Sequence, residues 1–273
     1  MKISRRDFIR NVSLAGSLLA TGGFTSLSAA EIVALDNKVR LRFIVASDGH
    51  YGQPGTLYDE FFSTVIDHIN LFHKSLPVDF CVMNGDIIHN EKQLLIPARN
   101  ILNRLVPPYY VTKGNHDMVT DTYWNEVWQM PVNLHVAIKG SALILATTSN
   151  EQGDYLSPDL QWMEEKLEES KKHKNIFVFI HIPQAKWTVN AIDTPSFFEL
   201  LQNYQNVKAV FHGHEHDQDG AMINNGIPFL FDSHFGGNWG TEYKGFRVVE
   251  VMKDNTVVTY MMNPGQKMKE EKY

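Results

Sequence analysis

The chain has 273 residues, a formal net charge of −6 at pH 7, and a composition that is 43% hydrophobic and 21% charged. These proportions are those of an ordinary globular protein with enough chain for a real core. The negative charge and the lack of a dense Lys/Arg run in the body argue against nucleic-acid binding, which needs cations that neutralise phosphates. The single cysteine, Cys81, lies in an apolar run, so no internal disulfide can form and a core position is expected.

The first thirty residues have the features of an export signal. The twin arginine Arg5-Arg6 precedes a modestly apolar run at 12–20, and small residues end the segment before Glu31. The segment resembles a bacterial Tat signal peptide, which implies that 1–30 are cleaved and that the Tat translocase is a partner during export. The domain at 31–273 is then expected in the periplasm or outside the cell. The alternative, an uncleaved anchor, is disfavoured because the apolar run is too short to span a membrane comfortably.

Strand and helix patterns alternate along the first part of the body. Residues 41–46, 79–83 and 109–112 are rich in apolar residues, as in buried strands. Between them, 57–74 and 93–105 carry apolar side chains at helical spacing. This order is typical of an α/β protein.

The alternation continues to about residue 211 and then changes. The predicted elements are a helix at 123–129, a hairpin at 133–148, a helix from Ser157 to about Lys174, a strand at 175–180, a helix at 194–204 and a strand at 207–211. Three further strands, at 227–231, 246–251 and 257–262, have no helices between them, which predicts a second sheet rich in antiparallel pairs. No repeat or flexible linker divides the body, so we expect one domain.

Five of the predicted strands end in Asp, His or Asn residues. These residues are Asp48 and His50, Asp86, Asn115 and His116, His181, and His214 and His216. Ligands of α/β proteins bind outside the carboxyl ends of the strands. Mixed nitrogen and oxygen ligands suit Mn, Fe or Zn better than calcium or magnesium. Seven ligands from this set of eight residues are too many for one ion and suit two divalent transition-metal ions that share a carboxylate. The alternative is a set of unrelated polar turns.

The residues at these five places resemble those of the calcineurin-like metallophosphoesterases. The family pattern D-x-H, G-D, G-N-H-[DE], H and G-H-x-H is complete and in order. It stands here as Asp48-Gly49-His50, Gly85-Asp86, Gly114-Asn115-His116-Asp117, His181 and Gly213-His214-Glu215-His216. The resemblance covers about 41–262 and implies a four-layer α/β/β/α sandwich of two mixed sheets. The dimetal site would lie on loops at the strand ends, along one edge of the sheets.

The resemblance also implies a role for each residue of the pattern. One metal would be held by Asp48, His50, Asp86 and His216, and the other by Asp86, Asn115, His181 and His214, with Asp86 bridging the two. His116 would be the catalytic histidine near the leaving-group oxygen, and Asp117 would orient its ring. The implied activity is hydrolysis of small-molecule phosphoesters, diesters or monoesters, by a hydroxide that the two metals activate.

Two further histidines are candidates for substrate binding. His89 stands three residues after Asp86, where the purple acid phosphatases of this superfamily carry a tyrosine, and this departure argues against a tyrosinate–iron site. His89 lines the substrate pocket or belongs to a surface turn. His234 lies in the aromatic, glycine-rich loop 231–240 and is placed either against substrate or in a loop folded over the core with Trp239 buried.

A second function, from another class, is a non-catalytic binding module of the same fold that metal ions stabilise. His116 discriminates between the two, because a binding module has no need of it beside a full set of metal ligands. No cap domain is evident in the sequence. This predicts an open cleft and slightly favours diesters over monoesters, although the choice stays open.

Overall fold

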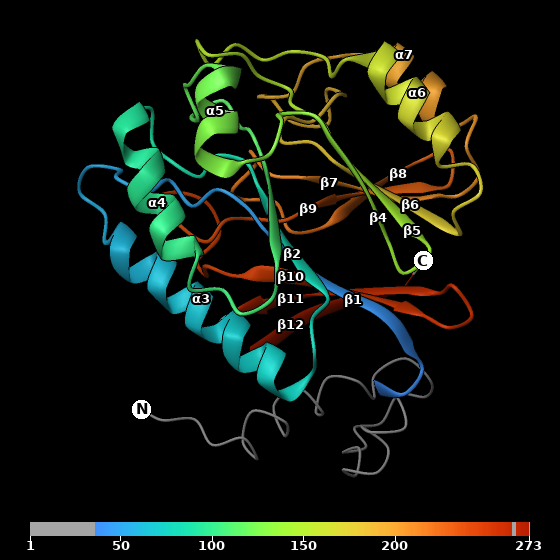
Figure 1. The fold of residues 1–273 in the computed structure, drawn as a ribbon, viewed down its shortest axis with the longest axis horizontal. Helices are drawn as coiled ribbons and strands as arrows, with labels where there is room; N and C mark the ends of the chain where they lie inside the picture. Colours follow the sequence, from blue (N-terminus) through green and yellow to red (C-terminus); the bar gives the residue numbers. More distant parts are fainter. Residues whose placement is uncertain (1–35, 264–265, 273) are drawn as a thin grey trace.

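The computed structural model describes residues 36–263 and 266–272, so the segment expected to be an export signal lies outside the described residues. Two six-stranded sheets lie face to face, with helices on their outer sides (Figure 1). This arrangement confirms the predicted four-layer α/β/β/α sandwich. The polar strand ends of both sheets come together at one edge, which is where the site lies.

The first sheet has the strand order β12-β11-β10-β1-β2-β3. Its strands are β1 (Val39–Ala46), β2 (Phe80–Asn84), β3 (Tyr109–Thr112), β10 (Phe246–Met252), β11 (Val257–Asn263) and β12 (Gln266–Lys272). The three N-terminal strands pair in parallel, whereas β10 pairs antiparallel with β1 and starts an antiparallel edge. Cys81 is buried on β2, as expected.

The second sheet has the order β4-β5-β6-β7-β9-β8. Its strands are β4 (Leu134–Ile138), β5 (Ser141–Leu145), β6 (Asn175–Phe179), β7 (Val207–His212), β8 (Ala221–Asn224) and β9 (Ile227–Phe231). The expectation that the strands after residue 211 form a sheet of their own is wrong. β9 pairs in parallel with β7, whereas β10 pairs with β1 and β11 with β10, so both extend the first sheet. The reason is that outward apolar residues of β9 join the core beneath α6 and α7, while those of β10 and β11 join the core beneath α3.

The five α-helices of the described part are divided between the two outer faces. α3 (Tyr58–Ser75), α4 (Leu95–Leu102) and α5 (Asp121–Trp128) pack on the first sheet, with η1 (Lys92–Leu94) leading into α4. α6 (Leu160–Glu169) and α7 (Pro195–Leu201) pack on the second. α6 begins after the expected start at Ser157, because its N-cap is Asp159, whose carboxylate accepts the backbone N–H of Trp162.

The two sheets meet through an aromatic layer. Phe43 on β1 stacks on Phe80 with centroids 4.8 Å apart, and it meets Phe177 and Phe211 of the opposite sheet edge-on at 5.1 and 5.8 Å. These strands are covered on both sides, which explains why their sequences are continuously apolar rather than alternating. The layer holds the two sheets in a fixed relation, and therefore also the loops at their ends.

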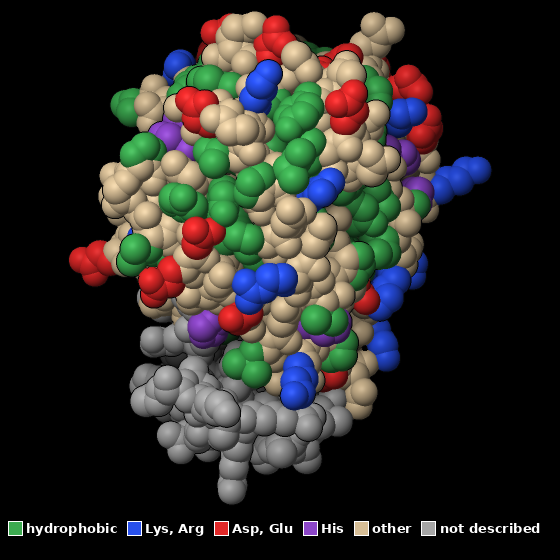
Figure 2. Space-filling model, turned by 60° about the vertical axis from the view of Figure 1, so that its left-hand side comes forward, with side chains coloured by type: hydrophobic (Ala, Val, Ile, Leu, Met, Phe, Trp, Pro, Cys, Tyr) green, Lys and Arg blue, Asp and Glu red, His purple; other side chains and the backbone are tan. Residues whose placement is uncertain are grey.

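The surface of the described part is mixed in charge. Acidic and basic side chains are interspersed over the face shown in Figure 2, with hydrophobic side chains between them. Within residues 36–263 and 266–272, no helix combines the length and apolar character needed to cross a membrane.

Candidate metal centre

All seven predicted metal ligands lie at one edge of the sandwich. Asp48 and His50 follow β1, Asp86 follows β2, Asn115 follows β3, His181 follows β6, and His214 and His216 follow β7. Six of them are buried, and His214 is partly exposed. Because three strands of one sheet and two of the other end here, residues up to 168 positions apart are brought into one cluster.

The ligand atoms form two groups. In the first, Nε2 of His216 lies 3.0 Å from Nε2 of His50 and 3.0 Å from Oδ1 of Asp48. In the second, Asp86, His181 and His214 offer ligand atoms within 4.8 Å of one another, with Nε2 of His181 3.2 Å from Oδ2 of Asp86. The same Asp86 oxygen lies 3.7 Å from Nε2 of His50, so Asp86 stands between the two groups. The groups contain six of the seven residues in the two ligand sets that the sequence pattern implies, all but Asn115.

The backbone holds two of these histidines by one ring nitrogen. The carbonyl of Asn84 accepts from Nδ1 of His181 at 2.8 Å, and the carbonyl of Trp239 accepts from Nδ1 of His216 at 3.2 Å. A carbonyl only accepts, so the bonded nitrogen carries the proton and the other keeps its lone pair. The tautomers suited to metal ligation are thus set by the fold.

Several buried atoms of the cluster have no hydrogen-bond partner among the described residues. They are Nε2 of His181, Nε2 of His214 and Oδ1 of Asn115. Buried polar atoms are normally paired, and leaving one unpaired costs about 1–3 kcal/mol. The residues therefore fit metal ions, because a cation would satisfy these lone pairs together with the neighbouring carboxylates.

The electrostatics of the cluster favour positive charge. Burial alone would lower the pKa of His181, but the carboxylates of Asp86 and Asp48 outweigh it and raise that pKa to about 10. Burial would raise the pKa of Asp86, yet the neighbouring His181 and His50 hold it well below its usual range. The carboxylates thus stabilise a proton on His181 in the chain alone. A metal ion would take that place and release the proton.

The backbone of the cluster is unusual in its conformation. Asp48, His50, Asp86 and His214 have positive φ angles of 58°, 47°, 50° and 70°. Such angles are uncommon outside glycine and cost of order 1–3 kcal/mol where the surroundings impose them. Four of the seven predicted ligands share this feature. The turns after the strands therefore direct these side chains toward the cluster, and this costs conformational energy.

Two glycines of the motifs are needed because other atoms approach them closely. A Cβ on Gly213 would lie 1.9 Å from Oγ of Ser47 and 2.7 Å from Oδ2 of Asp48. A Cβ on Gly114 would lie 2.3 Å from the backbone nitrogen of Asp86. These spacings leave no room for a side chain, which explains why glycine precedes the ligands in the sequence.

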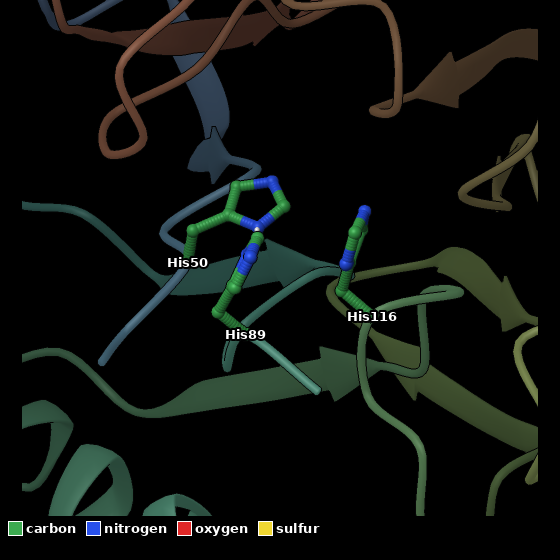
Figure 3. A group of neighbouring side chains, drawn as sticks. All are labelled: His50, His89 and His116. Carbon is green, nitrogen blue, oxygen red and sulfur yellow. Dashed lines mark hydrogen bonds between the residues drawn. The ribbon is translucent and has the colours of Figure 1, made fainter. Parts of the chain in front are cut away.

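His116 lies beside both groups without belonging to either ligand set. Its backbone N–H donates to Oδ1 of Asp86 at 2.7 Å, and its ring lies 4.8 Å from that of His50 (Figure 3). Its Nδ1 donates to the amide oxygen of Asn90 at 2.7 Å, which leaves Nε2 free. Asn90 was not predicted. Its only signal in the sequence is its place next to His89, and its φ of 68° is one that asparagine tolerates.

The expected contact between Asp117 and the ring of His116 is corrected by the structure. The Asp117 carboxylate accepts the backbone N–H groups of Ile88 and Gly114, at 3.0 and 2.9 Å. Burial raises the pKa of Asp117 to about 7, and the nearby Asp86 adds to the rise. Asp117 therefore ties together the loops after β2 and β3, while Asn90 orients His116.

The two histidines expected at the substrate have different surroundings. His89 is partly exposed and stacks on His116 at 4.9 Å, so it lies at the site. His234 is buried, and both of its ring nitrogens face backbone carbonyls, of Gly236 and Thr241. It stacks behind His216 at 5.0 Å, which corrects its expected place against substrate.

Within loop 231–240, the exposed aromatic side chain next to the metal-ligand groups is that of Trp239. It covers the other side of His216 with the ring centroids 4.2 Å apart, and 42% of it is exposed. Loop 231–240 is therefore only partly buried. A cleft of about 390 Å³ opens here, lined among others by Trp239, His214, His216, Asn190 and Glu215. The cleft gives access to the metal-ligand groups from one side.

A comparison with known protein families matches residues 41–218 to the calcineurin-like phosphoesterases. The chain belongs to this family. The matched range contains every predicted metal ligand as well as His116 and Asn90. Membership of this family supports a role as a hydrolase. No curated protein sequence matches the chain.

Solved structures of this calcineurin-like phosphoesterase fold resemble the chain at low identity. A dimetal phosphatase from Danio rerio superimposes with a TM-score of 0.70 at 13% identity, over 86% of this chain and 98% of the other. The purple acid phosphatase PPD1 from yellow lupin (Lupinus luteus) seeds gives 0.63 at 13% identity, over 85% of this chain and 53% of its own. GAP50, the anchor in the inner membrane complex of Plasmodium, gives 0.63 at 16% identity, over 86% and 89%. These likenesses show the shared fold.

Proposed function

We propose that the chain is a metal-dependent phosphoesterase that hydrolyses phosphoester bonds of small molecules. The observation that carries the proposal is the pair of ligand groups with Asp86 between them and His116 beside them, its Nε2 free. In this proposal one ion is held by Asp48, His50, Asp86 and His216, and the second by Asp86, Asn115, His181 and His214.

When bound, two divalent ions supply charge that lowers the pKa of an attacking water and neutralises phosphoryl oxygens. The chain's own residues supply the rest. His116 is oriented by Asn90 and Asp86 so that its protonated ring can give the proton on Nε2 to the departing alkoxide, while Nδ1 keeps the proton that it donates to Asn90. The cleft beside Trp239 receives the alcohol part of the ester and offers an aromatic face to it.

The proposal is tested by hydrolysis assays with the purified chain after reconstitution with Mn, Fe or Zn. The substrates are p-nitrophenyl phosphate, its bis ester and cyclic nucleotides, which separate monoesterase from diesterase activity. Asp86→Asn is expected to abolish the activity because Asp86 serves both groups, whereas Asp67→Asn, an exposed carboxylate on α3, leaves it unchanged. Wild-type protein that binds both metals but cleaves none of these esters would favour the non-catalytic binding module.

We further propose that the chain is exported by the Tat route to the periplasm or beyond. The support is the twin arginine Arg5-Arg6 ahead of an apolar run. Replacing both with lysine is expected to leave folded precursor in the cytoplasm, as measured by fractionation and immunoblotting. Normal export of the double variant would contradict the proposal.

A further inference from the structure

His50 differs from His181 and His216 in what holds its ring. Its Nε2 faces Asp48, Asp86 and His216, while its Nδ1 lies 3.1 Å from Nδ1 of His89 (Figure 3). His181 and His216 each donate from Nδ1 to a backbone carbonyl, as described above, and this fixes their tautomers. His50 instead meets an imidazole, which either donates or accepts at Nδ1.

Only one of the two possible hydrogen bonds is compatible with metal ligation by His50. If His89 donated from Nδ1, neutral His50 would carry its own proton on Nε2, and that nitrogen would have no lone pair for a metal. If His50 donates, its Nε2 is free to ligate and Nδ1 of His89 must be unprotonated. Neutral His89 then carries its proton on Nε2.

A third metal ion held by His50, His89 and His116 does not fit the ring geometry. The three rings offer nitrogens within 4.8 Å of one another. However, the rings of His89 and His116 are stacked, with an interplanar angle of 12° and centroids 4.9 Å apart. A metal lies close to the plane of each imidazole that binds it, and two stacked planes share no such point. The stack is better explained as packing that fixes how the His89 ring faces His50.

We propose that His89 is a positioning residue that accepts the Nδ1 proton of His50 and so commits His50 to binding metal through Nε2. This inference rests on the ligand role of His50 in the proposed function. No hydrogen bond from the described residues ends on Nε2 of His89, so the same tautomer leaves one N–H at the site for a phosphoryl oxygen.

Two substitutions of His89 distinguish the effect of its hydrogen-bond acceptor from the effect of its aromatic ring. His89→Asn places an amide oxygen where Nδ1 was and keeps the acceptor. His89→Phe keeps an aromatic ring against His116 but has no acceptor. His68→Phe on α3, a partly exposed histidine with its Nδ1 on the Thr64 carbonyl, is the matched control for loss of an imidazole.

The first measurement is calorimetric titration of each purified chain with Zn²⁺ alone. His89→Phe is expected to weaken one of two Zn²⁺ sites by roughly 10–100-fold, the usual effect of losing a partner behind a ligand. His89→Asn should stay within a factor of about three of wild type, and His68→Phe should be unchanged. Equal affinity of wild type and His89→Phe at both sites would overturn the proposal.

The second measurement reads the tautomers directly, by ¹⁵N–¹H correlation spectra of the histidine side chains in the Zn²⁺-loaded chain. We expect His89 with the proton on Nε2 and His50 with the proton on Nδ1. A proton on Nδ1 of His89 would overturn the proposal even if affinity had changed. Neither measurement uses hydrolysis, so an inactive chain with these results would refute the phosphoesterase function and leave the positioning role of His89 intact.

Discussion

His116 is held in place by contacts that do not depend on a metal ion. Its backbone bonds Asp86, its Nδ1 bonds Asn90, and its ring stacks on His89. Since neither ligand set includes His116, removal of its side chain should disturb the geometry of the metal ligands little. The residue can therefore be tested for proton transfer separately from metal binding.

We expect His116→Ala to lower kcat/KM on the order of 10²–10⁴-fold for esters with poorly leaving alcohols, because general acid catalysis contributes about that much. The loss should be much smaller for p-nitrophenolate, which departs without a proton. Asn90→Gly tolerates the φ of 68° but removes the hydrogen-bond acceptor for Nδ1 of His116. Its loss in kcat/KM should therefore depend on the leaving group in the same way, but be smaller. The measurement is kcat/KM over leaving groups of graded pKa, with metal content checked alongside. An equal fractional loss for all leaving groups would contradict the proton-donor role.

The residues of the motifs could be predicted because their types and spacings are visible in the sequence. Their hydrogen-bond partners were harder to predict. Asp117 is adjacent to His116, yet the turn sends its carboxylate to two backbone N–H groups, and Asn90 from another loop takes the ring. His234 has the right residue type, but loop 231–240 folds it behind His216. Contacts with other loops decide where these side chains point, and no local pattern in the sequence shows those contacts.

At the scale of elements, one buried ion pair links the two sheets. Arg247 on β10 donates to Oδ1 of Asp232, which directly follows β9, at 2.7 Å. Its guanidinium also donates to the carbonyls of Phe231 and Asp219, at 2.7 and 2.8 Å. Both partners are essentially inaccessible to solvent. The pair thus fixes the start of loop 231–240 against the first sheet.

At pH 8.5 we expect Arg247→Met to lower the free energy of unfolding by about 3–5 kcal/mol, the usual cost of leaving a buried charge without its partner. Arg104→Met, which removes an exposed pair with Asp67, should cost about 0–1 kcal/mol. Both are measured by urea denaturation. A loss for Arg247→Met no larger than for Arg104→Met would show that the link between the sheets contributes little.

The same variant should depend on pH in a defined direction. Burial raises the pKa of Asp232 to about 7 even against the opposing pull of Arg247, and removing Arg247 should raise it further. The folded state then binds a proton that the unfolded state releases near pH 4, so stability falls as pH rises from there through the folded pKa. Arg247→Met should therefore lose more stability at pH 8.5 than at pH 6. The opposite trend would mean that Asp232 stays ionised.

The existence of most elements could be predicted from apolar runs, but their partners could not. Residues 227–231 and 246–251 both read as strands, and they join different sheets as β9 and β10. The choice depends on which apolar face each strand covers, and therefore on contacts between residues far apart in the chain. Sequence spacing carries no information about those contacts.

At the scale of the whole molecule, the ligand groups join the two halves of the sandwich. Asp48, His50, Asp86 and Asn115 come from loops of the first sheet, and His181, His214 and His216 from loops of the second. Each proposed metal ion would bind residues of both sheets. Bound metal would thus connect the sheets at the edge where their loops carry strained backbone and unpaired buried atoms.

Metal binding should therefore raise the stability of the entire fold. A ligand that binds only the folded chain adds about 2.7 kcal/mol at 100 times its Kd, which corresponds to roughly 5–10 °C in Tm for a domain of this size. We expect Zn²⁺ or Mn²⁺ to raise Tm of wild type by at least this amount, and EDTA to reverse the rise. The measurement is thermal unfolding followed by circular dichroism, with and without the metal.

Two variants show whether the rise comes from this site. Asp86→Asn should lose most of it, because Asp86 lies between both groups, while Asp67→Asn should keep it in full. Asp86→Asn without metal should be less stable than wild type without metal, since it removes the carboxylate that pairs with His181, so the rise in Tm is compared within each variant. If the metal raised the Tm of Asp86→Asn as much as that of wild type, the stabilising ion would lie elsewhere and the two ligand sets would be wrong.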